Sequence, residues 1–199
     1  AYSDSQTFCH NQGIAVLDLE TRDKRLFPDP LSEVGEEPEG DDDVNLCGPD
    51  LFGIGDITWA PDARRLAFSD DPNGDAVLHV LDTAAAADLA DATAVDPTHA
   101  YNHPEWVADG RIVAEAMGAD NGAGSHPEDE GGIFAVDPAT GFRERILPGI
   151  DHAYDIDADI TGRHLIVTDT RHSRTFTRAT IEGMDVETIE GPALADVDW

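Results

Sequence analysis

The chain has 199 residues, a hydrophobic fraction of 40% and 42 acidic against 12 basic residues, for a formal net charge of −30. This length supports one sizeable core. No apolar run approaches the ~20 residues of a membrane-spanning helix, and the charge repels the phosphates of nucleic acids and anionic lipids. The composition therefore indicates an acidic globular protein that spans no membrane and binds neither DNA nor RNA.

The acidic residues are spread along the whole chain, and Lys24 is its only lysine. Two origins of this acidity remain open. One is adaptation to high salt, where a carboxylate-rich surface stays hydrated and its self-repulsion is screened. The other is export from an organism with a GC-rich genome, whose codons favour Asp, Ala, Gly and Arg. In both cases we expect the charge to destabilise the protein at low ionic strength.

The N-terminal part predicts strands at 6–10, 13–20 and 24–27, followed by an acidic loop at 29–51 that is too poor in apolar residues to pack. Cys9 and Cys47 lack the paired spacing of a zinc site. They form either a disulfide, which would place the protein in an oxidising compartment, or two buried thiols. No signal peptide is visible, although one could precede this numbering.

A strand–turn–strand pattern then occurs three times, at 55–68, 102–113 and 155–167. Each copy is followed by a further apolar strand, at 76–82, 132–137 and 175–182, and then by an outer strand such as 143–147 or 185–189. The alanine-rich segment 84–94 fits either one or two helical turns or a loose outer strand. Four strands in every ~40–50 residues are typical of propeller blades.

The two ends of the chain complement each other. Residues 193–199 match only the first strand of a blade, whereas the N-terminal strands match the second to the fourth. We therefore predict one all-β domain over 1–199, a four-bladed β-propeller with four antiparallel strands a blade, closed when the C-terminal strand pairs with the N-terminal blade. One blade is shared by 1–28 and 193–199, and the others cover about 52–97, 99–149 and 152–191. The alternative is part of a longer propeller chain, with any activity in sequence outside these residues.

The first copy of the pattern carries a recognisable motif. Its sequence from Asp56 reads Asp-Ile-Thr-Trp-Ala-Pro-Asp-x-Arg-Arg-Leu-Ala-Phe, which resembles the TolB-type (PD40) propeller repeat. The second copy keeps Trp106 and an Asp-Gly-Arg turn at 109–111, and the third has Asp159 in place of the tryptophan. The resemblance implies an extracytoplasmic binding protein, secreted, periplasmic or at the cell surface, attached to an envelope complex. Similar repeats also occur in peptidases and other hydrolases.

The first strand of each blade lines the axis of a propeller. Aligning the copies places His99 and His152 at one level, Asp155 at a second, and Asp56, His103, Ile156 and Asp196 at a third. His99, His103 and His152 could bind a divalent cation, or these histidines could satisfy nearby backbone groups and channel water. Tyr101 and Tyr154 lie near the axial mouth, where they and Asp56, Asp155 and Asp196 are candidates for ligand binding.

The sequence contains no nucleophile elbow and no phosphate-binding glycine loop, and it implies no firm cofactor. We therefore expect a protein-interaction or scaffold propeller without catalytic activity, whose partner presents a basic surface. The alternative is a propeller that binds a metal or a small ligand at the axial mouth, with hydrolysis as a further function of that site.

Overall fold

The computed structural model describes residues 2–7, 10–28, 54–70, 76–117, 131–151, 153, 155–168 and 175–190. Within these ranges the chain forms strands almost throughout, and the one helical element is a 3₁₀ turn, Leu89–Asp91. No helix among the described residues is long and apolar enough to cross a bilayer. The predicted all-β class is therefore confirmed.

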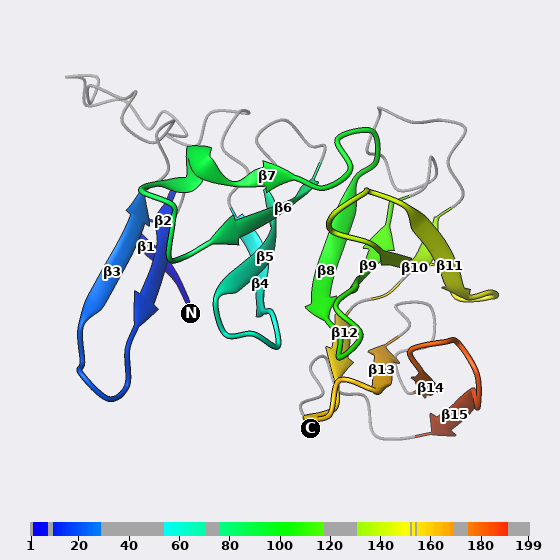
Figure 1. Ribbon diagram of the computed structural model, residues 1–199. Coiled ribbons are helices and arrows are strands. Elements are labelled where there is room, and N and C mark those ends of the chain that lie inside the picture. The colour runs from blue at the N-terminus through cyan, green and yellow to red at the C-terminus, as the bar shows by residue number, and fades with distance from the viewer. Residues whose placement is uncertain are drawn as a thin grey trace, which may run out of the picture.

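The strands form four antiparallel sheets that follow one another in chain order (Figure 1). The first contains β1 (Tyr2–Thr7), β2 (His10–Leu17) and β3 (Lys24–Pro28). The second contains β4 (Ile54–Trp59), β5 (Arg65–Asp70), β6 (Val77–Asp82) and β7 (Thr93–Ala94). The third contains β8 (Tyr101–Trp106), β9 (Ile112–Ala116), β10 (Gly132–Val136) and β11 (Arg143–Leu147). The fourth contains β12 (Asp155–Ala158), β13 (His164–Thr168), β14 (Thr175–Thr180) and β15 (Glu187–Glu190).

Each sheet is a meander in which neighbouring strands are consecutive in the chain. The strands β4, β8 and β12 begin their sheets, and β8 contacts both β4 and β12, so these three are the inner strands of three neighbouring blades. The first sheet supplies three strands to a fourth blade. The predicted closing strand at 193–199 lies outside the described residues, as do Cys9, Cys47 and the acidic loop from residue 29 to residue 51.

The core lies between the sheets, in three clusters that each join two consecutive blades. Ile14 and Phe27 of the first sheet pack with Leu66 of the second. The second and third clusters join the remaining sheets in the same way, with Leu78 packed near Trp106 and Ile133 near Leu165. Burial of these apolar faces between blades is the main force that holds a propeller together.

The turns that follow the inner strands are built by aspartates. The Asp62 Oδ1 accepts the backbone N–H groups of Arg64 at 2.9 Å and Arg65 at 3.1 Å. The Asp109 Oδ1 accepts the N–H of Arg111 at 3.0 Å, and in the third turn the Asp159 Oδ1 accepts the N–H of Arg163, four residues on, at 2.9 Å. A short carboxylate side chain is suited to such turns because it bonds to backbone N–H groups two or three residues on. Many acidic residues of the repeat therefore have a structural role.

Turn chemistry also explains where two predictions were inexact. The strand predicted at 13–20 ends at Leu17, because the Asp18 carboxylate accepts the N–H groups of Glu20 and Thr21 and reverses the chain. The segment 84–94 contains both predicted features. The Asp88 side chain caps the 3₁₀ turn, and β7 then adds two residues to the sheet.

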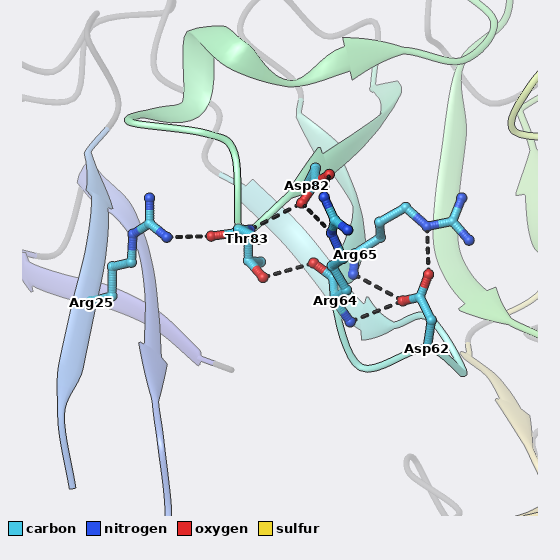
Figure 2. Close-up of polar contacts among 7 residues, drawn as sticks. Arg25, Asp62, Arg64, Arg65, Asp82 and Thr83 are labelled. Carbon is cyan, nitrogen blue, oxygen red and sulfur yellow. Dashed lines mark hydrogen bonds and ion pairs between the residues drawn. The ribbon is translucent and has the colours of Figure 1, made fainter. Parts of the chain in front are cut away.

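Polar contacts join the first two blades (Figure 2). Arg25 on β3 donates to the carbonyl groups of Thr83 and Ala86 in the loop after β6. The same loop is held by Arg64, which donates to both carboxylate oxygens of Asp82 at 2.9 and 2.8 Å. A single arginine thus satisfies loop carbonyls that would otherwise have to find partners at the blade boundary.

Candidate functional site

The axial site is formed by the three inner strands. Asp56 lies on β4, His103 and Glu105 lie on β8, and Asp155 and Asp157 lie on β12. The central strand of the three is β8, which contacts both β4 and β12. The meeting of their polar side chains follows from the blade arrangement, because each inner strand turns one face toward the axis.

Two β-bulges set the directions of the Asp56 and His103 side chains. The pairing of β4 with β5 shifts register between Ile54 and Ile57, and that of β8 with β9 shifts between Asn102 and Glu105. His103 lies inside the second bulge with a φ of 50°, in the left-handed region that non-glycine residues rarely occupy. Such irregularities re-aim side chains, and here they bring Asp56 and His103 together.

The Asp56–His103 pair is the centre of the site. The His103 Nδ1 lies 2.6 Å from the Asp56 Oδ2. Burial lowers the pKa of His103, but the hydrogen bond and charge of Asp56 outweigh it, helped by the charges of Glu115 and Asp155, and the pKa is raised overall. The hydrogen bond from His103 in turn lowers the pKa of Asp56. The pair therefore favours the ionised state of both partners.

Glu105 is the second unusual group. Burial raises its pKa to about 7, and the charges of Asp157 and Asp155 add to this effect. Hydrogen bonds from the Thr58 side chain and the Ala158 backbone oppose the rise without cancelling it. Glu105 therefore exchanges a proton near neutral pH, where an ordinary glutamate is fully ionised. A perturbed carboxyl near further carboxylates can bind a cation, hold a proton or orient a polar ligand.

The observed levels along the axis correct the sequence alignment. Trp59, Trp106 and Ala158 each end an inner strand, paired with Leu66, Ile112 and Leu165 respectively. Counting back from these ends puts Thr58, Glu105 and Asp157 at one level, and Asp56, His103 and Asp155 at the next.

The prediction that Asp159 replaces the tryptophan and that Ile156 shares the level of His103 was therefore wrong by one residue. Ile156 is 5% exposed in the core, and Asp159 belongs to the turn. A one-residue slip moves a side chain to the opposite face of a strand. Sequence reasoning missed Glu105, although it directly precedes Trp106 of the repeat and therefore shares the level of Thr58 in the sequence alignment.

His99 and Tyr101 belong to a separate cluster around Asp96. The Asp96 Oδ2 accepts the Tyr101 hydroxyl at 2.8 Å and lies 2.6 Å from the His99 Nδ1, while its Oδ1 accepts Thr98. These hydrogen bonds outweigh the effect of burial and lower the pKa of Asp96. Tyr101 is completely buried between the second and third blades, so its role here is structural. Asp96 precedes its strand in an Asp-Pro-Thr segment, and no sequence signal singled it out.

The predicted metal ligands are divided between these clusters. His99 pairs with Asp96 and His103 with Asp56, and His152 lies outside the described residues, as do Tyr154 and Asp196. Within the described part of the chain, no three His, Cys, Asp or Glu side chains form a group suited to a metal ion. The cation site thus remains a prediction that involves residues outside the described ranges.

Comparison with known proteins supports the fold. No family model matches the sequence, and no curated protein matches it. Among solved structures, TolB from Acinetobacter baumannii has a TM-score of 0.58 at 13% identity, over 91% of this chain and 38% of that one. A TolB from Agrobacterium tumefaciens has a TM-score of 0.50 at 15% identity, over 66% of this chain and 47% of that one. A puromycin hydrolase has a TM-score of 0.52 at 17% identity, over 72% of this chain and 22% of that one.

The four antiparallel sheets and these likenesses define a four-bladed β-propeller. Within that class the fold is TolB-like, as the repeat motif predicted. The chain spans less than half the length of each of these structures. At such low identity the likeness establishes the fold alone.

Proposed function

We propose that this propeller is a protein-binding scaffold, an accessory part of an extracytoplasmic envelope complex, and that it carries out no catalysis. The observation that carries the proposal is the set of large apolar side chains exposed on the blade formed by β12 to β15. Ile160 is fully exposed, Met184 59% and Val186 56%. Grouped apolar side chains on an otherwise strongly charged surface are typical of interaction sites. The TolB-like fold supports an extracytoplasmic setting.

The charge defines the chemistry of the partner. A net charge of −30 on 199 residues attracts a basic surface and accelerates its association. Because salt screens this attraction, we expect the affinity to weaken as the salt concentration rises from ~50 to ~500 mM.

Selection from a displayed library of random 12-residue peptides tests the proposal. The folded protein should enrich peptides that combine apolar with Lys or Arg residues, and these peptides should not bind the heat-unfolded chain. Enrichment of no peptide over the unfolded control would contradict the protein-binding function. Affinities that do not change with salt would contradict the role of the acidic surface.

A second candidate function is cation or small-ligand binding at the axis, favoured by the convergence of Asp56, His103, Glu105 and Asp155. Metal content measured by plasma mass spectrometry, on protein purified without chelator or affinity metal, tests it. A stoichiometric metal that is lost in His103→Ala but retained in His99→Ala would support an axial site. The second variant is a matched control because it also removes a histidine paired with an aspartate.

A further inference from the structure

The exposed apolar residues are concentrated on the blade formed by β12 to β15. Eight large hydrophobic side chains are exposed among residues with described burial, and four of them lie on this blade: Ile160, Met184, Val186 and Ile189. Ile160 occupies the β12–β13 turn, and Met184 and Val186 occupy the β14–β15 turn. The other blades expose apolar residues at the β2–β3 hairpin and at Phe142.

An open cleft of about 460 Å³ lies at the same end of this blade. Its walls come from three turns, with Ala108 and Asp109 from the β8–β9 turn, Arg163 from the β12–β13 turn, and Glu182 from the β14–β15 turn. Ile160 is three residues from Arg163, and Met184 is two residues from Glu182. Ile160 and Met184 do not themselves line the cleft, but each lies in a short turn that supplies one of its wall residues.

The turns around the cleft are fixed to one another. The Ala108 N–H donates to the Gly162 carbonyl at 2.9 Å, which joins two blades, and the Ile181 N–H donates to the Arg163 carbonyl at 3.1 Å. The Thr180 N–H donates to the Met184 carbonyl at 2.9 Å and closes the third turn. A surface held by backbone hydrogen bonds loses little conformational freedom when a ligand binds, which favours affinity.

The charges beside the cleft define its occupant. Glu182 and Asp185 are exposed on either side of Met184, whereas the Asp109 carboxylate at the wall is already paired with Arg111 at 2.7 Å. Arg163 brings a long aliphatic stem that can cover an apolar group while its guanidinium stays in water. An apolar side chain flanked by basic residues complements both the apolar and the acidic parts of this surface.

We propose that this cleft is the peptide-docking site of the protein, and that it binds an extended segment of a partner protein with an apolar anchor residue flanked by Lys or Arg. This inference rests on the proposed function and assigns it to one face of one blade. Ile160 and Met184 contact the anchor, and Glu182 contacts a flanking basic residue.

The test uses the peptides enriched from the displayed library, labelled with a fluorophore and titrated by fluorescence anisotropy. We expect Ile160→Ser and Met184→Ser each to weaken binding about ten-fold or more, because each removes apolar surface buried in the complex. Glu182→Gln should weaken binding several-fold and reduce its dependence on salt. The side chains at all three positions are exposed, so the variants should keep the circular dichroism and melting temperature of the original protein.

Matched controls make the result specific. Phe142→Ser removes a similarly exposed apolar side chain on another blade, and Glu20→Gln removes an exposed carboxylate on the β2–β3 turn. Both should bind the peptides within about two-fold of the original affinity.

Equal losses of affinity in the control and test variants, or no loss in the test variants, would overturn the docking site and leave the protein-binding function intact. Failure to enrich any peptide would overturn the protein-binding function itself. A dimer that Ile160→Ser converts to a monomer in sedimentation would show that a second copy of the chain occupies this surface, which also overturns the peptide proposal.

Discussion

Replacing Glu105 by glutamine should stabilise the protein at alkaline pH and leave its stability unchanged in acid. Because the folded state raises the pKa of Glu105 from 4.5 to about 7, it holds a proton that the unfolded chain has already lost. The free energy of unfolding therefore falls as the pH rises from about 4.5 to 7, and the whole loss of stability from ionised Glu105 is present above pH 7. Glutamine keeps the shape of the side chain and cannot ionise.

The size of the effect follows from the size of the shift. At about 1.4 kcal/mol for each pKa unit, the shift corresponds to a cost on the order of 3 kcal/mol. Relaxation around a side chain that is not fully buried reduces this, so we expect Glu105→Gln to gain about 1–3 kcal/mol at pH 8. For a chain of this length the melting temperature should rise by roughly 2–4 °C for each kcal/mol.

Urea unfolding at pH 8 and pH 4.5, followed by circular dichroism, measures this difference. Urea is preferable to guanidinium because it adds no ions to a protein whose charge is −30. Glu20→Gln is the control, since it also removes one negative charge but at an exposed position. An equal gain at both pH values would refute the argument, because it would not come from ionisation of Glu105. A loss at pH 8 would also refute it and would indicate that the ionised carboxylate has a stabilising partner there.

Three further predictions follow from the same structure. Asp56→Asn should lower the pKa of His103, which NMR titration measures. The variant should also be less stable, mainly between about pH 4 and 6.5, where both partners of the original pair are ionised. An unchanged titration of His103 would exclude the ion pair. Gly183→Ala should destabilise the protein by more than about 1 kcal/mol in urea unfolding, because the glycine has a φ of 70° and a Cβ atom there would lie 1.7 Å from the Ile146 carbonyl oxygen. Gly149→Ala is the control, because Gly149 has a φ of 99° and an added Cβ atom there would lie in open space; this variant should lose less stability. Equal losses in the two variants would show that the contact with Ile146 has no effect. Raising NaCl from ~10 mM to ~1 M should raise the melting temperature as the Debye length shrinks from about 30 to 3 Å, and a constant or falling melting temperature would show that self-repulsion is unimportant.

The repeat made the fold predictable. Each copy of the pattern contains two short strands around a turn whose aspartate bonds to the following backbone N–H groups, as at Asp62 and Asp109. These interactions are local, so they leave a strong mark in the sequence. The apolar strands that follow bury their faces against the next blade, and their spacing predicted the number of sheets.

The axial site was less predictable because bulges change the register of the inner strands. The strands β4 and β8 each have a bulge that includes Asp56 and His103 respectively, whereas β12 pairs with β13 without a shift of register. The sequence alignment set Asp159 in the place of the tryptophan, so it put Ile156 at the level of Asp56 and His103 and placed Asp155, also predicted on the axis, at another level. The pairing of Asp56 with His103 was predicted at the correct level, since the two bulges compensate each other. The Asp96 cluster depends on a loop before β8, and local sequence patterns do not determine such a contact.

The acidic residues of this protein form two groups with opposite pKa shifts. One group stabilises the turns, and the other belongs to the candidate axial site. At the turns, hydrogen bonds from backbone N–H groups lower the pKa of aspartates such as Asp18 and Asp62 and so favour their ionised state. On the inner strands, burial and neighbouring charges raise the pKa of Glu105 to about 7. A fall in pH from 8 to 6 therefore leaves these turn aspartates ionised and adds a proton to Glu105. A ligand that binds near Glu105 and His103 should therefore change its affinity over this pH range.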